Sequence, residues 1–337
     1  MSYELVGITV LWIFLFGYVI VASVDFGAGF FSLYSHWTGQ KHVLHKLIQR
    51  YLSPVWEVTN VFLVFFFVGV VGFFPKTAYY YGTALLIPGS ISIILLAIRG
   101  SYYAFNTYGS KENTLFTVLY GITGVLIPAS LTTVLTISEG GFIEEKDSGI
   151  QLLTAKLLTS PFSWSVVLLA IVSVLFISAS FLLYYADKAG DHKAVKLLRR
   201  YALGWSFPSI LSAVVVFYTL REHNPSHFNN MLSDVWMFAL SLLFFLGAVR
   251  LIYKGRAYGT AFLFVVFQYG LAFFAYGISH YPYLLYPSLT IYDGFTNETM
   301  ALALVVAFIA GLFLLLPSLY LLLKLFLFNT QYIKGNK

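Results

Sequence analysis

One carboxylate interrupts the long apolar stretch at the start of the chain. Asp25 lies in the sequence VDFGAGF (24–30), and no other Asp, Glu, Lys or Arg occurs between Leu5 and Trp37. An apolar stretch of this length is typical of a membrane span, where an ion costs a few kcal/mol or more. We therefore expect Asp25 to be paired, protonated, or part of a path for ions or protons.

Two more charged residues flank apolar stretches that follow. Glu57 stands at the start of the second stretch, and Asn60 shares its helical face three residues later, so that Trp56, Glu57 and Asn60 form a polar stripe. Arg99 closes the third stretch, which runs from 84 to 98. If consecutive spans alternate in direction, Asp25, Glu57 and Arg99 should converge at one membrane depth.

Each of these groups also has a purely structural interpretation. Glu57 could serve only to favour a helix N-terminus electrostatically, and Arg99 could extend its guanidinium to the headgroups. Asp25 could form a structural ion pair with Arg99. For Gly27 and Gly29 we favour packing, because small residues let neighbouring helices approach closely.

Composition places these residues in a membrane protein. Of the 337 residues, 59% are apolar and only 10% are charged. The chain has no cysteine, which excludes disulfides, iron–sulfur clusters and thiolate-bound metals. All histidines fall in connections or at span ends, and the few methionines add no convincing ligand set for haem or copper. We therefore expect no catalytic residue and no metal ligand in this chain. The net charge of +6 is modest for a nucleic-acid-binding protein, and no nucleic acid is expected as a partner.

The expected fold is all-α and polytopic, with about nine transmembrane helices. A short amphipathic helix at 41–52 is expected to lie in the headgroup layer before the second span. The span boundaries follow from charged and turn residues. The expected spans are 5–34, 55–74, 78–99, 114–137, 162–186, 201–220, 231–250, 258–279 and 299–323.

Basic residues predict the orientation of the spans. Under a nine-span arrangement, sixteen of the 20 Lys and Arg fall on one side. The other side receives Lys76, Lys146, Lys156 and Arg221. The positive-inside rule then places the N-terminus outside and the C-terminus in the cytoplasm. It also places Asp25, about 30 Å along the helix from Leu5 at 1.5 Å per residue, in the cytoplasmic half.

The whole chain, 1–337, is expected to form a single integral membrane domain. Four spans precede the longest outer loop and five follow it. The expected arrangement is a helical bundle at 1–137, an outer loop at 138–161, and a second bundle with an extra helix at 162–325.

Together these motifs resemble subunit II of the cytochrome bd-type quinol oxidases. The first span ends in DFGAG (25–29), the second begins SPVWE (53–57) and continues with Asn60 and Val61, and the third ends at Arg99. Chain length, span number and an external N-terminus match as well. The resemblance covers the whole chain in topology, whereas its specific motifs lie in about the first hundred residues.

The resemblance implies a bacterial terminal oxidase in the cytoplasmic membrane that oxidises quinol and reduces oxygen to water. Its b-type and d-type haems and its quinol-binding loop would belong to subunit I. This chain would be the haem-free partner, without a redox centre, that stabilises subunit I. Membrane lipids, quinol and a small single-span subunit are the other expected partners of the complex.

The same resemblance gives the acids a role in proton supply from the cytoplasm. Glu57 would be an entry group and Asp25 a relay or structural acid, with Arg99 setting their proton affinity and Trp56 and Asn60 supporting them. The alternative from another class is a secondary transporter that uses Asp25 as an ion or substrate site. A purely structural scaffold, with the charges forming a neutral packing cluster, is also compatible with the sequence.

Overall fold

The computed structural model describes residues 2–108, 114–147, 149–322 and 324. Side chains are described for these residues apart from 41, 42, 45, 46, 49–58, 104–108 and 322. The predicted site residues Trp56 and Glu57 therefore have side chains that lie outside the described part of the chain.

The first helix, α1, runs from Tyr3 to Trp37. The Ser2 hydroxyl accepts a hydrogen bond from the backbone N–H of Leu5 at 3.4 Å and so caps its start. Gly39, with a φ of 72°, turns the chain at the other end. Between these points the sequence is apolar all round, as expected for a helix surrounded by other helices or lipid.

Residues 41–52 do not form the separate headgroup helix that was predicted. They are the first part of α2, which runs without interruption over Lys41–Phe73. Leu44, Leu47 and Ile48 are buried in the same hydrophobic cluster as Phe31 of α1. The apolar face of this amphipathic stretch thus packs on the protein, and the prediction of a separate short helix was wrong.

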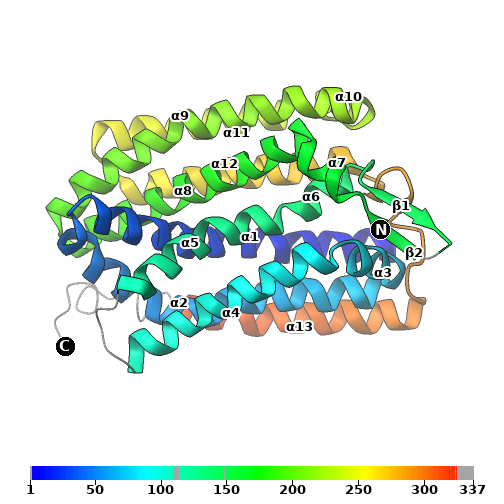
Figure 1. Cartoon of the computed structure of the whole chain (residues 1–337), viewed down its shortest axis with the longest axis horizontal. Coiled ribbons are helices and arrows are strands. Elements are labelled where there is room, and N and C mark those ends of the chain that lie inside the picture. Colours follow the sequence, from blue (N-terminus) through cyan, green and yellow to red (C-terminus); the bar gives the residue numbers. More distant parts are fainter. Residues whose placement is uncertain (1, 109–113, 148, 323, 325–337) are drawn as a thin grey trace.

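The remaining helices and strands follow in order, and Figure 1 shows their arrangement. The helices are α3 (Pro75–Ala84), α4 (Leu86–Tyr108), α5 (Thr114–Leu131), α6 (Thr133–Ser138), α7 (Thr154–Thr159), α8 (Pro161–Ala189), α9 (His192–His223), α10 (Pro225–Ser233), α11 (Val235–Lys254), α12 (Tyr258–His280) and α13 (Glu298–Leu322). Two antiparallel hairpins lie in the connections: β1 (Ile143–Lys146) with β2 (Gly149–Leu152), and β3 (Tyr283–Leu285) with β4 (Leu289–Thr290).

Among the described residues, eight helices are long and apolar enough to cross a membrane, or nine if one bent pair counts as a span. That pair is residues 59–73 of α2 with α3, between which the helix direction bends by 119°. The expectation of about nine spans is therefore confirmed. The predicted span 78–99 is divided differently: the chain breaks near Leu85, and α4 continues to Tyr108. Arg99 consequently lies inside a helix and not at its end.

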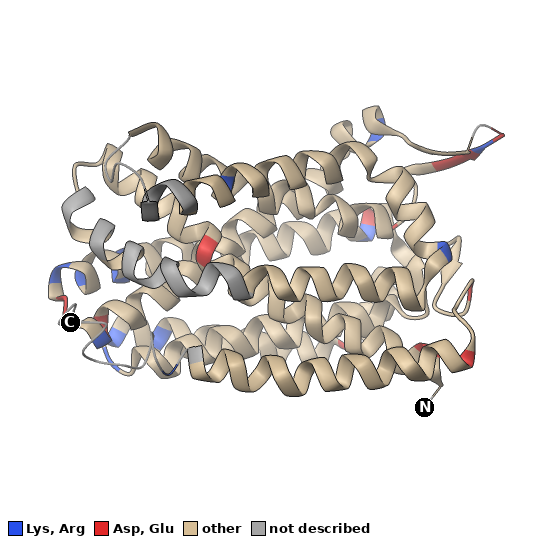
Figure 2. Cartoon of the chain, turned by 90° about the horizontal axis from the view of Figure 1, so that it is seen from below, with Lys and Arg blue, Asp and Glu red and all other residues tan. Residues whose placement is uncertain are grey.

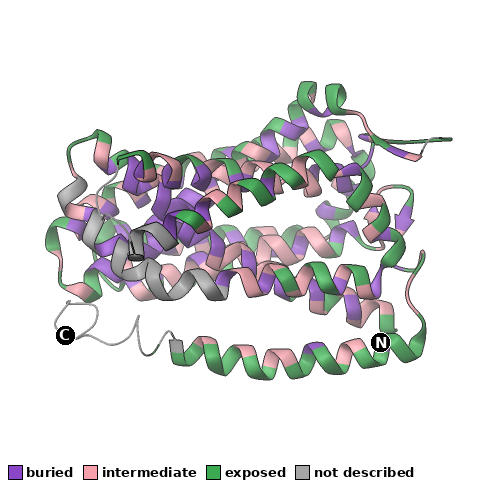
Figure 3. Ribbon diagram, turned by 60° about the horizontal axis from the view of Figure 1, so that its bottom comes forward, coloured by how far each residue is buried: buried purple, intermediate pink, exposed green. Residues whose placement is uncertain are grey.

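Helix α1 lies at the centre of the packing, in contact with α2, α5 and α8. In Figure 1 it runs between α8, α9, α11 and α12 on one side and α2, α4 and α13 on the other. The C-terminal helix α13 packs against α2 and α1 and is largely exposed, as Figure 3 shows. The grouping into two bundles with an extra helix stays a prediction.

Charged residues gather at the two ends of the helices. Figure 2 shows Lys and Arg concentrated at the end that holds the α8–α9 and α11–α12 connections, whereas Asp and Glu are more frequent at the opposite end. The distribution has the form expected from the positive-inside rule. We call these the basic end and the acidic end.

Candidate functional site

Arg99 extends from α4 to Asp25 on α1. Its Nε donates a hydrogen bond to Asp25 Oδ2 at 2.8 Å, and Nη2 donates to the backbone carbonyl oxygen of Asp25 at 2.7 Å. Asp25 is 3% exposed and Arg99 is 1% exposed. The interpretation that Arg99 extends to the headgroups is therefore wrong, because its guanidinium is directed into the protein.

The rest of the guanidinium is also held in place. Nη1 donates to the carbonyl oxygen of Tyr120 at 2.9 Å and to Thr123 Oγ1 at 3.3 Å. The guanidinium carbon lies 4.2 Å from the centre of the Tyr120 ring and 5.2 Å from that of Phe26. These contacts add cation–π attraction to the hydrogen bonds. Arg99 thus links α4 to both α1 and α5.

Two tyrosine hydroxyl groups complete the surroundings of the Asp25 carboxylate. The hydroxyl of Tyr103 donates to Oδ1, and that of Tyr120 lies 3.3 Å from the same oxygen. A buried carboxylate with a guanidinium on one oxygen and hydroxyls on the other is well solvated by the protein. We call Asp25, Arg99, Tyr103 and Tyr120 the Asp25 cluster.

Glycines make this close approach of α1 and its neighbours possible. A Cβ atom on Gly29 would lie 2.5 Å from the carbonyl oxygen of Tyr120 and 3.1 Å from Arg99 Nη1. On the other face of α1, a Cβ atom on Gly27 would overlap Ser178 of α8. The packing interpretation of both glycines is therefore confirmed.

Other polar residues lie on α1 and α2. Tyr18 lies seven residues before Asp25, on the same helical face, and its buried hydroxyl has no hydrogen-bond partner among the described residues. On α2, Thr59 is buried and Asn60 is half-buried. The structure thus brings Asp25 and Arg99 together, while the position of Glu57 relative to them stays a prediction.

The sequence did not predict a second buried polar cluster, at the acidic end. Glu139, just after α6, is 2% exposed. Its carboxylate accepts hydrogen bonds from Asn224 Nδ2 at 2.9 Å and the Tyr276 hydroxyl at 2.5 Å, and both its oxygens lie 2.9 Å from His227 Nδ1. His280 is also buried beside it. We call Glu139, His227 and His280 the Glu139 cluster.

Glu139 remains a carboxylate in spite of its burial. Burial alone would raise its pKa, but the hydrogen bond with His227 and the nearby His280 lower it below its ordinary value. In the sequence the histidines occupy connections or span ends, and no ligand set for haem or copper was expected from them. The only available signal was that Glu139, His227 and His280 all lie at span ends on one side of the membrane.

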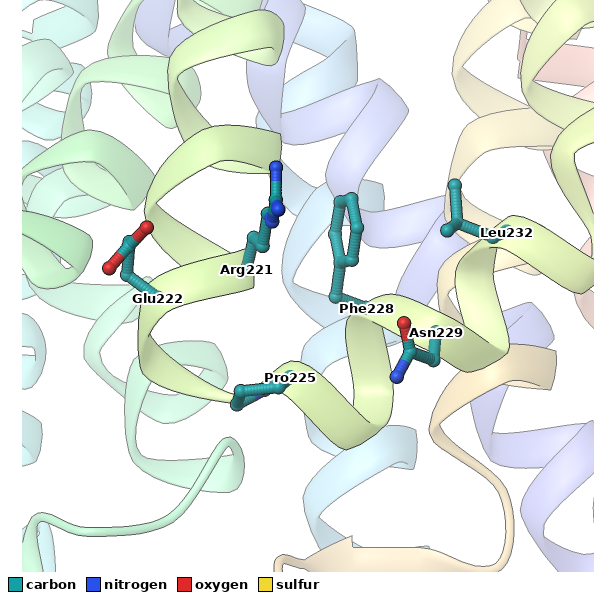
Figure 4. Close-up of a pocket in the computed structure, with 6 residues that line it drawn as sticks. All are labelled: Arg221, Glu222, Pro225, Phe228, Asn229 and Leu232. Carbon is teal, nitrogen blue, oxygen red and sulfur yellow. The ribbon is translucent and has the colours of Figure 1, made fainter.

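The surface at the acidic end has a hollow of about 640 Å³ where α9 turns into α10. Figure 4 shows the side chains that line it. They belong to Arg221, Glu222, Pro225, Phe228, Asn229 and Leu232. Arg221 and Glu222 are exposed, and both are separate from the two buried clusters. Nothing in this lining points to a specific ligand.

The buried histidines His227 and His280 do not form a bis-histidine haem site. His227 and His280 are both buried, but their ring centres are only 4.8 Å apart, which leaves no room for a porphyrin between them. His227 Nδ1 is also engaged by Glu139 and its Nε2 by the Ser279 hydroxyl at 2.8 Å.

Comparison with known proteins gives consistent matches. The family model for cytochrome bd terminal oxidase subunit II matches residues 3–326. A putative cytochrome bd menaquinol oxidase subunit II of Bacillus subtilis (strain 168) is 35% identical over 339 residues, covering 98% of this chain and 97% of the relative. The solved structure of bd oxidase from Geobacillus thermodenitrificans contains a chain with 67% identity and a TM-score of 0.85. That match covers 98% of this chain and 100% of the solved chain.

The matches extend over nearly the whole chain and agree with the helical membrane fold. They do not favour the alternative of a secondary transporter. The chain belongs to the family of subunit II of the cytochrome bd terminal oxidases.

Proposed function

We propose that this chain is the haem-free subunit of its quinol oxidase, and that it stabilises the haem-bearing subunit I and supplies it with protons from the cytoplasm. As a member of its family, the chain is a multi-pass subunit of a bacterial membrane oxidase that works with a subunit I. The b-type and d-type haems and the quinol site would lie in that partner. A small single-span subunit and membrane lipids would complete the assembly.

The haem-free character is supported by the donor atoms that the chain offers. It has no cysteine, and methionine occurs only at positions 1, 231, 237 and 300. The two buried histidines described above are too close together to hold a haem between them. Redox chemistry in the complex is therefore assigned to the partner.

The observation that carries the proton-supply proposal is the buried carboxylate of Asp25. Reduction of oxygen to water takes up protons, and the reaction site is enclosed in the membrane, so protons need polar groups at membrane depth. Asp25 lies 12 residues before Trp37 at the end of α1, or about 18 Å at 1.5 Å per residue. It is thus closer to the basic end, which the positive-inside rule assigns to the cytoplasm.

The surroundings of Asp25 suit proton exchange. Arg99 holds the Oδ2 oxygen, whereas Oδ1 faces the hydroxyl groups of Tyr103 and Tyr120. A hydroxyl both donates and accepts hydrogen bonds, so it can take up one proton while it releases another. The buried Tyr18 hydroxyl extends this polar line toward the membrane centre. Glu57 would be the entry group, with Trp56 and Asn60 in support.

The test separates proton supply from a structural ion pair. Asp25→Asn removes the titratable group but leaves Arg99 buried without its countercharge, so it is compared with the charge-neutral pair Asp25→Asn/Arg99→Gln. Quinol oxidase turnover and the haem spectrum of the purified complex are measured for both. Asp187→Asn, which changes an exposed carboxylate at the end of α8, is the control.

If Asp25 relays protons, turnover falls in both variants while the haem spectrum is kept. If the pair is only structural, the double variant has normal turnover because no unpaired charge remains. Normal turnover in Asp25→Asn itself would also contradict the relay. Glu57→Gln should slow turnover in the same way if it is the entry group.

A further inference from the structure

We propose that the Glu139 cluster is a binding site for a divalent transition-metal ion of the Zn²⁺ type. Glu139, His227 and His280 each offer one ligand atom, and these three atoms lie within 4.8 Å of one another. One carboxylate and two imidazoles form a set that zinc uses in proteins, with an open fourth position. The proposal concerns the acidic end and is independent of the proton route at Asp25.

The distances show how little movement metal binding would need. His227 Nδ1 lies 2.9 Å from Glu139 Oε1, and His280 Nδ1 lies 3.6 Å from the same oxygen. Ligand atoms around tetrahedral zinc, each about 2.0–2.1 Å from the ion, are separated by a little more than 3 Å. Small rotations of the side chains would therefore open a coordination site between the carboxylate and the two rings.

The ligands are supported by a second set of hydrogen bonds, as is usual around metal sites. The Ser279 hydroxyl lies 2.8 Å from His227 Nε2 and is itself anchored by donating to the Tyr276 carbonyl oxygen at 3.0 Å. Asn224 Nδ2 donates to Glu139 Oε2 at 2.9 Å. These bonds fix the directions in which Glu139 and His227 present their lone pairs.

His280 points to a missing ligand. It is 9% exposed, and its Nδ1 lies 3.6 Å from Glu139 Oε1, which is too far for a good hydrogen bond. Burial therefore removes water from Nδ1 without supplying a close partner in its place, which is costly. A metal ion bound at Nδ1 would use the lone pair directed at Glu139 and polarise the ring.

Electrostatics favour a cation at the same place. Glu139 is a buried carboxylate, and among the described residues its ion-pair partners are histidines, which are charged only when protonated. A divalent ion held by neutral imidazoles would compensate the buried charge without that proton. Borderline ions such as Zn²⁺ accept nitrogen and oxygen ligands together, whereas Ca²⁺ and Mg²⁺ prefer oxygen alone.

The site joins separate segments of the chain. Glu139 follows α6, His227 belongs to α10, and His280 ends α12, so the ion would tie together three segments that are far apart in the sequence. The end of α6 also lies beside the β3–β4 hairpin, because Tyr286 N–H donates to the Ser138 carbonyl oxygen at 2.9 Å. Binding should therefore stiffen the acidic end of the subunit.

The experiment uses the intact oxidase complex, stripped with a chelator and equilibrated with buffered Zn²⁺. Bound zinc is counted by mass spectrometry, and the thermal midpoint of the complex is recorded with and without the ion. His280→Asn is the main variant, because His280 makes no close hydrogen bond to Glu139 and its loss should spare the fold. His192→Asn, an exposed histidine at the start of α9, is the matched control.

We expect the wild-type complex and His192→Asn to bind one more zinc per complex than His280→Asn, and only these two to gain thermal stability from zinc. Glu139→Gln, which keeps the size of the side chain, should also lose that zinc. Equal zinc content in wild type and His280→Asn would overturn the proposal, as would a wild-type complex that binds none. If His280→Asn fails to assemble, the same comparison is made with Glu139→Gln.

Discussion

Arg99 donates hydrogen bonds to both the side chain and the main chain of Asp25, to Oδ2 at 2.8 Å and to the carbonyl oxygen at 2.7 Å. The second bond matters because a helix carbonyl normally accepts only from the N–H one turn later. Arg99 therefore recognises the helix α1 as well as the carboxylate. A substitution of either residue therefore leaves the other without its buried partner.

The first prediction follows from this pairing. Arg99→Gln leaves the Asp25 carboxylate buried without its cation, and breaking a buried pair in this way costs about 3–5 kcal/mol. The charge-neutral Asp25→Asn/Arg99→Gln should be less destabilised than the sum of the two single variants. Unfolding of the complex in detergent, followed for the four proteins as a double-mutant cycle, measures the difference.

The exposed Arg256→Gln provides the control for that cycle, and its unfolding free energy should stay within about 0.5 kcal/mol of wild type. Additive effects of the Asp25 and Arg99 changes would show that the two charges do not stabilise each other. That result would contradict the pairing seen in the structure.

A second prediction concerns the space between α1 and α5. Gly29→Ala adds a Cβ atom 2.5 Å from the Tyr120 carbonyl oxygen, so the helices must separate and the guanidinium of Arg99 must shift. Overpacking of this kind costs about 1–3 kcal/mol. The thermal midpoint of the complex should fall. An unchanged midpoint would mean that α5 moves away freely.

Gly204→Ala in α9 is the matched control for Gly29→Ala. A Cβ atom there would have no neighbour within 4 Å, and alanine is favoured over glycine inside a helix by about 0.5–1 kcal/mol. The thermal midpoint of the Gly204→Ala complex should therefore equal or exceed that of wild type. The two substitutions are chemically identical, so their difference isolates the contact with Tyr120.

The sequence predicted the membrane fold well because length and apolarity alone identify a span. It also predicted that Asp25 and Arg99 lie at the same membrane depth. Consecutive spans alternate in direction, and the basic loops indicate which ends of the spans lie on the same side of the membrane. The prediction misplaced the end of the third span because α4 carries Arg99 in its interior, where Asp25 compensates the charge. A charged residue therefore does not mark the end of a span when a residue far away in the sequence neutralises its charge.

The Glu139 cluster was missed for a related reason. Its members come from positions 139, 227 and 280, and each alone resembles a polar residue in a loop. Their burial depends on how the segments after α6, in α10 and at the end of α12 fold over the acidic end. No periodicity in the sequence encodes that arrangement.

A third prediction tests the start of α9. Asp191 Oδ1 accepts hydrogen bonds from the backbone N–H groups of Lys193 and Ala194 at 3.1 and 3.0 Å, so it caps the helix. Asp191→Ala should cost about 0.5–2 kcal/mol in unfolding free energy. Asp187→Ala, three residues from the C-terminal cap of α8, is the control and should be neutral or slightly stabilising, because a negative charge is unfavourable there. If both variants lost the same unfolding free energy, the loss would come from removing a negative charge in this loop and not from removing the helix cap.

The last prediction concerns pH and the connection between α12 and α13. The side chain of Asp293 accepts hydrogen bonds from the Thr290 backbone N–H at 2.7 Å and the Thr290 hydroxyl at 2.6 Å, and these bonds lower its pKa below 3.8. The stabilisation by the carboxylate is therefore complete above the unfolded pKa and lost only as the pH falls through the folded one. Asp293→Asn should reduce hydrogen-exchange protection of residues 283–293 by the same factor throughout about pH 5 to pH 8, after correction for intrinsic rates. A difference that shrinks within this window would show that Asp293 titrates near neutrality, contrary to its hydrogen bonds.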